Sequence, residues 1–207
     1  MPSSRPIVLS PSTPSELLSY IVTYQCYPTT ILIGWPKQVF IDALIQDQDQ
    51  PSHPLLHASL LQIAVSRHIR LAFIPTVTHL RAYLTTFSPS DSKIQPPPNH
   101  KHRNTHLPNL LVYGFLELHR DGSEWSAQGL GTTAAALIEA AARTSFRPAI
   151  VEPRGALGYE VLDEFLNENV PLLSGSSMGG DGMWKGRIVP IRRVLNRWFE
   201  FEAPKEE

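Results

Sequence analysis

Four short apolar segments alternate with helical patterns along the chain, and this alternation limits the possible folds more than any other feature of the sequence. The segments span residues 30–33, 69–74, 110–116 and 149–151. Each is a continuous apolar run, which is typical of strands buried on both faces. Because helices separate them, the sequence predicts an α/β fold with a mainly parallel sheet, helices on both faces and an antiparallel C-terminal extension.

The helices are predicted from their caps and from apolar residues at helical spacing. Thr13, Pro14 and Glu16 form a capping box that starts the first helix. Thr76 is expected to cap another helix, and the alanine-rich stretch 132–143 is the strongest helical segment, since alanine has the highest intrinsic propensity. The remaining helices are expected at 36–44, 56–64 and 161–166.

Polar and proline-rich segments set the boundaries of a single domain over residues 14–202. Residues 1–13 are expected to be a flexible N-terminus, 88–107 a disordered loop that contains three consecutive prolines, and 203–207 a tail. The stretch 174–183, rich in Gly and Ser, is predicted as a flexible loop. Residues 185–202 fit either two strands or a helix, and their β-branched and aromatic residues favour strands.

Composition excludes several classes of protein. The 207 residues include 42% hydrophobic and 18% charged residues, and the net charge is −1. Bulk charge therefore does not attract nucleic acid, although a local basic patch can. The single cysteine, Cys26, rules out an internal disulfide and favours a reducing compartment. No apolar run approaches the ~20 residues of a membrane span. We therefore expect an intracellular, soluble domain.

The turn after the segment 30–33 stands where a nucleotide-binding α/β protein carries its phosphate loop. In TTILIGWPKQVF, Gly34 is the only glycine, Pro36 has no amide to donate, and Trp35 takes up space that an anion needs. Lys37 is followed by glutamine instead of the Ser or Thr that binds Mg²⁺. The strand 110–116 also ends without a metal-binding acid, and Glu117 is interpreted as a solvated residue at its end. Two parts of an ATPase site are therefore missing.

The other polar clusters do not predict a catalytic or metal site. The three histidines within 100–106 lack a cysteine or acidic partner at ligand spacing. His119, Asp121 and Glu124 follow the third strand, where a turn accounts for them and no nucleophile is paired with a base. The sequence therefore predicts no enzyme activity, no cofactor and no metal ligand.

The segment 185–197 is the most basic part of the chain and contains no acids. Its basic residues are Lys185, Arg187, Arg192, Arg193 and Arg197. Trp184, Trp198 and Phe199 lie next to them, and arginines combined with aromatic rings suit phosphate contact and base stacking. We predict that the five basic residues bind DNA. The alternative is an edge strand protected by charge, with the aromatic rings packed on the core.

Four stretches suggest a family when they are taken in order. They are IRLAFIPTVTHLRAYLTTF, then LLVYGFLELH followed by the helix QGLGTTAAALIEAAA, and the ending GRIVPIRRVLNRWFEF. Over residues 14–202 the chain resembles the RecA-like ATPase core, and specifically the degenerate recombinase paralogues without ATPase motifs. Because both nucleotide motifs are missing here, the resemblance does not imply ATP hydrolysis.

The resemblance implies a non-catalytic subunit of a nuclear complex that assists homologous recombination and DNA repair, of the Shu complex type. The implied partners are another RecA-like subunit in a hetero-oligomer, a recombinase filament, and single-stranded or forked DNA. The loop after His119 and the stretch 174–183 correspond to DNA-contacting loops of that family. Val77, Leu80 and Leu84, or the face 134–142, are expected either to bind the partner or to belong to the core.

Two other functions remain open at this point. One is an ATPase-dead RecA-like subunit of an Elongator-type accessory complex, which would act in tRNA modification in the cytoplasm. The other is a small α/β enzyme with an unrecognised site.

Overall fold

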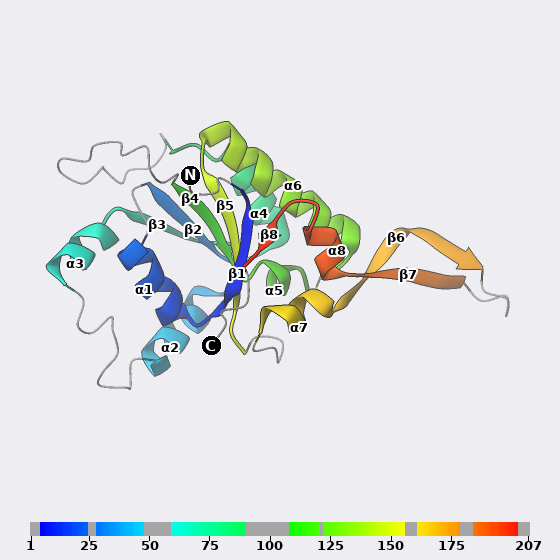
Figure 1. Cartoon of the computed structure of the whole chain (residues 1–207), viewed down its shortest axis with the longest axis horizontal. Helices are drawn as coiled ribbons and strands as arrows, with labels where there is room; N and C mark the ends of the chain where they lie inside the picture. Colours follow the sequence, from blue (N-terminus) through cyan, green and yellow to red (C-terminus); the bar gives the residue numbers. More distant parts are fainter. Residues whose placement is uncertain are drawn as a thin grey trace.

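A computed structural model describes residues 5–24, 28–47, 59–89, 108–120, 122–155, 161–178 and 184–202. Its body is a sheet of six strands in the order β3-β2-β4-β5-β1-β8 (Figure 1). The strands are β1 (Ile7–Ser12), β2 (Thr29–Ile33), β3 (Ile69–Phe73), β4 (Asn109–Tyr113), β5 (Arg147–Pro153) and β8 (Glu200–Phe201). All neighbouring strands in this sheet are parallel, which confirms the predicted α/β fold class.

Helices cover both faces of the sheet. On one face pack α1 (Pro14–Tyr24) and α2 (Lys37–Asp47), and on the other α4 (Val77–Thr86) and α6 (Ala127–Thr144). The shorter helices are α3 (Leu60–Ser66), α5 (Phe115–Arg120), α7 (Leu162–Asn167) and α8 (Ile191–Leu195). In the described part of the chain, no helix combines the length and apolar character that crossing a membrane requires.

The apolar runs reflect burial on both sides of the sheet. In β2, Ile31 and Ile33 pack with the α1–α2 side, whereas Leu32 packs with the α4–α6 side. All three side chains are fully buried. Since successive residues of a strand point to opposite faces, a strand covered on both faces needs an apolar residue at every position.

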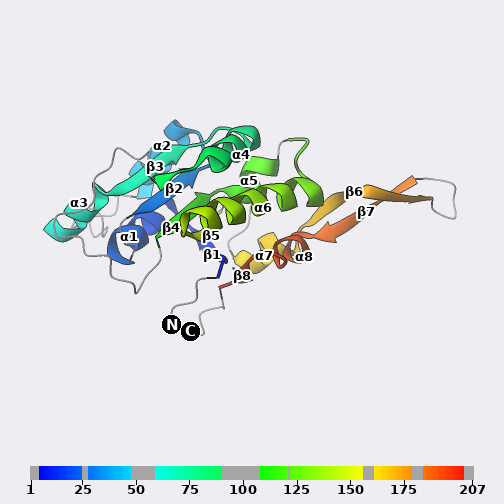
Figure 2. The same ribbon diagram turned by 90° about the horizontal axis from the view of Figure 1, so that it is seen from above.

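The N-terminal strand β1 differs from the prediction, because residues 1–13 are predicted to be flexible. The sequence IVLSPS pairs in parallel with β5 and with β8, and Val8 is buried. Its ladder with β5 is irregular around Pro11, which has no amide to donate. On the other side, Glu200 N donates to Pro6 O at 2.9 Å. The two ends of the described chain therefore lie side by side in one sheet (Figure 2).

The C-terminal segment divides into a ribbon, a helix and a strand. The strands β6 (Asn169–Met178) and β7 (Trp184–Pro190) form an antiparallel ribbon that projects from the body (Figures 1 and 2). This ribbon is the antiparallel extension, but it is a separate sheet, and β6 includes residues 174–178 of the predicted flexible loop. Residues 191–195 are helical instead of extended, and β8 joins the main sheet in parallel.

Two predicted helix starts are confirmed. The amide of Thr13 donates to Glu16 Oε2 at 2.9 Å, and the amide of Glu16 donates to Thr13 Oγ1 at 3.4 Å. Thr76 Oγ1 likewise accepts from the amide of His79 at 3.2 Å. The strand β4 is shorter than predicted, because Gly114 has a φ of 78° and turns the chain into α5.

The residues of two helices that were expected either to bind a partner or to belong to the core lie in the core. Val77, Leu80 and Leu84 are at most 7% exposed and pack where α4 meets α6 and the sheet. Ala134 and Ala141 on α6 are fully buried in the same cluster. The apolar spacing of both helices therefore reflects the packing of the domain, and of the two interpretations of these residues the structure supports the core.

Candidate functional site

The carboxyl edge of the sheet is where an open parallel sheet usually binds its ligand. After β2 the chain moves outward to β3, whereas after the neighbouring β4 it moves in the opposite direction to β5. Ligands of such sheets bind in the crevice where neighbouring connections diverge in this way. In this chain the crevice lies between Gly34, which follows β2, and Gly114, which follows β4.

This crevice is filled by the chain's own groups. Gly34 N donates to Tyr113 O at 2.8 Å, and a Cβ atom on Gly34 would lie 2.9 Å from Gly114 O. Glycine is thus required for close packing of two strand ends and not for anion binding. The Trp35 ring packs edge-on against Tyr113, with 5.7 Å between ring centroids, and its Nε1 donates to the Glu117 carboxylate. Glu117 therefore anchors Trp35, which differs from its interpretation as a solvated residue.

The strand β1 adds a second strand–turn–helix unit at the same edge, which the sequence analysis did not recognise. Its turn has no glycine, and Ser12 O accepts from the Tyr113 hydroxyl at 3.0 Å and from Arg154 N at 3.1 Å. Arg154 also pairs with Glu16 at 2.8 Å. The Glu16 carboxylate at the start of α1 would repel a bound phosphate. Neither turn therefore has the arrangement of a phosphate loop.

The polar residues near His119 hold three helices together. His119 is fully buried on α5, where its Nδ1 lies 2.7 Å from Phe115 O and its Nε2 lies 2.9 Å from Thr133 Oγ1 on α6. Burial lowers the pKa of His119 to about 4, so the ring is neutral near pH 7. From α4, Arg81 donates to Thr133 at 2.9 Å and to Glu124 at 2.5 Å. These contacts assign the cluster a structural role.

Glu152, near the end of β5, is an acid buried without a charge partner among the described residues. Its side chain is 0% exposed; Oε1 accepts from Leu116 N at 2.8 Å, and Oε2 has no hydrogen-bond partner in the described structure. Burial raises the pKa of Glu152 to about 8, with a smaller contribution from the charge of Glu117 and against the opposing effect of the Leu116 amide. The folded protein therefore holds this acid in its neutral form at pH 7.

We expect the wild-type protein to become less stable as the pH rises, and we expect Glu152→Gln to abolish this decrease. The folded state keeps the proton up to a pKa of about 8, whereas the unfolded state loses it near 4.5, so wild-type stability falls between these values. Urea denaturation should give similar midpoints for both proteins near pH 4.5 and a higher midpoint for the variant at pH 8. Glu139→Gln, on the exposed face of α6, is the control. A difference that does not change with pH would contradict the prediction.

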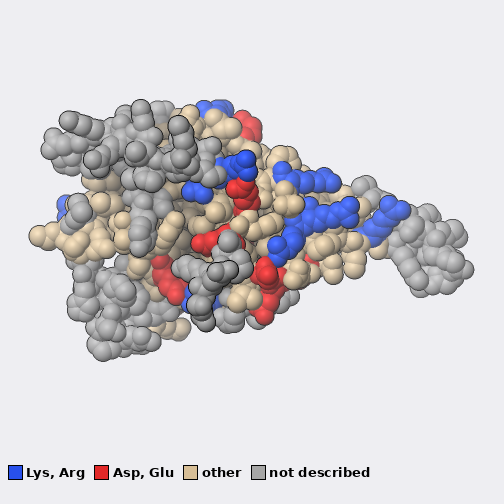
Figure 3. All heavy atoms as spheres, viewed as in Figure 1, with Lys and Arg blue, Asp and Glu red and all other residues tan. Residues whose placement is uncertain are grey.

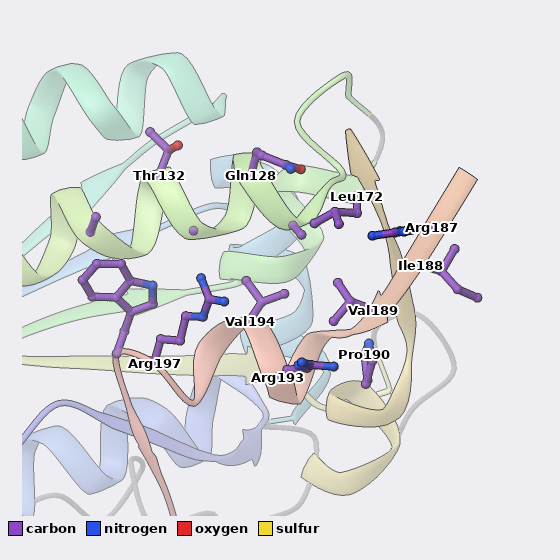
Figure 4. A pocket seen from close by; sticks show the side chains of 14 residues that line it. Gln128, Thr132, Leu172, Arg187, Ile188, Val189, Pro190, Arg193, Val194 and Arg197 are labelled. Atoms are coloured by element: carbon purple, nitrogen blue, oxygen red, sulfur yellow. The ribbon is translucent and has the colours of Figure 1, made fainter. Parts of the chain in front are cut away.

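A groove lies between α6 and the β7–α8 segment, with a volume of about 700 Å³ (Figure 4). We call it the arginine groove. Its α6 wall consists of Ala127, Gln128, Gly131, Thr132 and Ala135. Its other wall includes Arg187, Arg193 and Arg197 together with Val189, Val194 and Trp198. None of the described lining residues is acidic.

The structure brings three of the five predicted DNA-binding residues together in this groove. Arg187 comes from β7, Arg193 from α8 and Arg197 from the turn after α8, and all three are exposed. None of them forms an ion pair with another described residue. Lys185 belongs to β7, but its side chain lies outside the described part of the structure.

Arg192 is separated from these three arginines. It donates to Asp163 on α7 at 2.6 Å, and its guanidinium lies 5.3 Å from the centre of the Phe201 ring. Neighbouring residues of a helix point about 100° apart, so Arg192 and Arg193 face different surroundings. The charge of Arg192 is thus partly balanced within the domain.

Hydrogen bonds and register set the geometry of the groove. Gln128 Oε1 accepts from Leu173 N at 3.0 Å, which ties β6 to the start of α6. Leu172 is paired with Arg187 across the ribbon, and Figure 4 shows both side chains on the side of the ribbon that faces α6. In the space-filling view, a band of basic side chains extends from the body onto the ribbon (Figure 3). The arginine groove is therefore recessed and basic, with apolar side chains among its arginines.

The described residues contain no group of three or more His, Cys, Asp or Glu side chains placed to hold a metal ion. The histidines at 100–106 lie outside the described residues. No protein-family model matches the chain, and no similar curated protein is found.

Proposed function

We propose that the chain is a non-catalytic RecA-like subunit of a nuclear complex that assists homologous recombination and DNA repair, through partner binding and weak contact with DNA. The arginine groove carries this proposal. Arg187, Arg193 and Arg197 share one recess, and no acid among its described lining residues balances them. Three like charges held together repel one another, and a phosphate backbone offsets that repulsion while it releases counterions.

The number of arginines supports an accessory role. The electrostatic contribution to DNA binding grows with the number of phosphates that are neutralised, and this groove offers only three exposed arginines. The net charge of −1 adds no general attraction to DNA. Weak DNA contact of this kind is useful when a second subunit holds the chain close to the nucleic acid, because linkage raises the effective concentration.

The carboxyl edge supports the non-catalytic part of the proposal. The crevice between β2 and β4 is occupied by Trp35, and the turn after β1 carries the Glu16–Arg154 ion pair. The fold is a parallel α/β sheet with helices on both faces, the type to which RecA-like cores belong. A chain with this fold, whose described residues leave no open triphosphate site at this edge, is suited to assembly rather than turnover.

Affinity capture of the tagged chain from a cell extract tests this role. We expect another RecA-like subunit and recombinases to be recovered, with the complex found in the nuclear fraction. An unrelated α/β domain with the same tag is the control. Recovery of Elongator subunits instead would contradict the proposal and favour tRNA modification, and a nucleotide that co-purifies against Gly34 and Lys37 would contradict the non-catalytic role.

A further inference from the structure

The two walls of the arginine groove suit one strand of nucleic acid better than two. We propose that the groove holds a single-stranded nucleic acid, with backbone phosphates against the arginines, a base against Trp198 and the strand lying close to α6. This inference rests on the proposed function and adds to it the form of the ligand and a second contact surface, the α6 wall.

The α6 wall allows a ligand to approach the helix closely. Its residues at 127, 131 and 135 are alanine or glycine, one helical turn apart. A Cβ atom built on Gly131 has no atom within 4 Å, so open space lies directly in front of the helix. The wall begins at the first turn of α6, where the helix dipole is positive and favours an anion.

The opposite wall combines charge with apolar surface. Val189 and Trp198 are partly buried and pack against the core, and they line the groove with the three arginines and the buried Val194. Figure 4 shows Val194 and Arg197 extending toward α6 across the space of the groove. Stacking on an aromatic ring stabilises a base of a single strand, and arginines hold its phosphates. A single strand offers phosphates for the arginines and free base faces for the aromatic ring.

A duplex matches the groove less well. Its bases are stacked inside the helix, where Trp198 cannot reach them. A volume of about 700 Å³ lies in the range of small-ligand sites, which accommodates part of one strand rather than a double helix. The ribbon and α6 enclose this space on two sides (Figure 4). A duplex would therefore contact the exposed arginines without reaching the α6 wall or Trp198.

An acidic peptide is the other ligand with suitable charge. An amphipathic helix needs a continuous apolar groove for residues at helical spacing. Here arginines interrupt the apolar residues of one wall, and the α6 wall carries the polar side chains of Gln128 and Thr132 among small residues. The lining therefore favours a polymer with alternating phosphates and flat bases over a peptide.

A substitution that blocks the groove without changing its charge tests the inference. Gly131→Leu places a side chain in the open space, and Ala142→Leu adds the same group on α6 outside the groove. We expect Gly131→Leu to weaken binding of a fluorescent oligothymidine about tenfold, by loss of stacking and close approach, as measured by anisotropy. Binding of a DNA duplex should stay unchanged, and Ala142→Leu should match the wild type. Thermal melting checks that both variants fold.

Other results separate the failure of this inference from the failure of the proposed function. If Gly131→Leu binds oligothymidine normally while alanine at Arg187, Arg193 and Arg197 weakens it, the groove inference is wrong and DNA contact stands. Equal losses for oligothymidine and duplex overturn the single-strand assignment. Displacement of oligothymidine by poly-glutamate as efficiently as by unlabelled oligothymidine overturns it in favour of an acidic peptide. If neither set of variants changes DNA binding, the proposed DNA contact fails as well.

Discussion

Replacing Arg187, Arg193 and Arg197 together by alanine is expected to weaken binding of single-stranded DNA at least about tenfold at low salt and to flatten its salt dependence. Each phosphate contact to a single strand contributes about 0.7 to the slope of log affinity against log salt concentration, so three contacts account for about 2. The three arginines are exposed and have no ion-pair partner among the described residues, so their removal should disturb the fold little. Anisotropy titrations across a series of salt concentrations measure both quantities.

The neighbouring residues Arg192 and Arg193 provide the matched comparison. Each single alanine variant removes one positive charge, but Arg192 is paired with Asp163 and lies over Phe201. We expect Arg193→Ala to lower the salt slope by about 0.7 and Arg192→Ala to change it much less. Equal effects of the two variants would show that net charge matters and the groove does not. An unchanged slope in the triple variant would return all three arginines to a structural role.

The filled crevice and the exposed arginine groove both support the proposal of a non-catalytic, DNA-contacting subunit. At the position where parallel sheets usually bind a ligand, Trp35, Tyr113 and Glu117 occupy the space and satisfy one another. At the arginine groove, charged side chains remain exposed and unbalanced by described lining residues. The chain therefore combines a packed carboxyl edge with an exposed basic groove at the C-terminal ribbon, which we propose as the DNA-binding surface.

The sequence predicted the helices and strands that are determined by residues close together in the chain. The last three residues of the strand β2 are apolar because both faces are covered, and the Thr13–Glu16 capping box is a contact within four residues. By contrast, β1 contains Pro11 and two serines and resembles a flexible leader. It becomes a strand because β5 and β8 lie on either side of it, more than a hundred residues away. No local pattern records that pairing.

The site was predicted in part for the same reason. Charge and aromatic content identified residues 185–197, but not which arginines share a groove. That depends on the helical conformation of residues 191–195 after Pro190, where strands were favoured, and on the ribbon register that pairs Leu172 with Arg187. The sequence did not indicate that α6 forms a wall of the groove, because small residues in a helix are as typical of helix packing as of ligand binding.

Two glycines of α6 that lie two residues apart should respond in opposite ways to alanine. A Cβ atom on Gly129 would lie 2.1 Å from Glu124 O and 2.9 Å from the Glu124 carbonyl carbon, both backbone atoms. At Gly131 it would meet no atom within 4 Å. Alanine stabilises a helix interior by about 1 kcal/mol relative to glycine, so this gain should appear at position 131 and be outweighed by the clash at position 129.

The clash at Gly129 should spread because its neighbours are linked. Gly129 O accepts from Arg81 at 3.0 Å and lies 3.1 Å from Thr133 Oγ1, and Arg81 also holds Glu124. Moving Glu124 away from a new methyl group strains this network, which includes the buried His119. We expect Gly129→Ala to cost about 2 kcal/mol or more, which lowers the melting temperature by about 5 °C, and Gly131→Ala to raise it by about 2 °C. Scanning calorimetry of the two variants measures the contrast. A Gly129→Ala protein as stable as the wild type would contradict this prediction. It would mean that the loop before α6 moves without cost and that the hydrogen bonds of Arg81 do not fix the start of α6, which forms one wall of the groove.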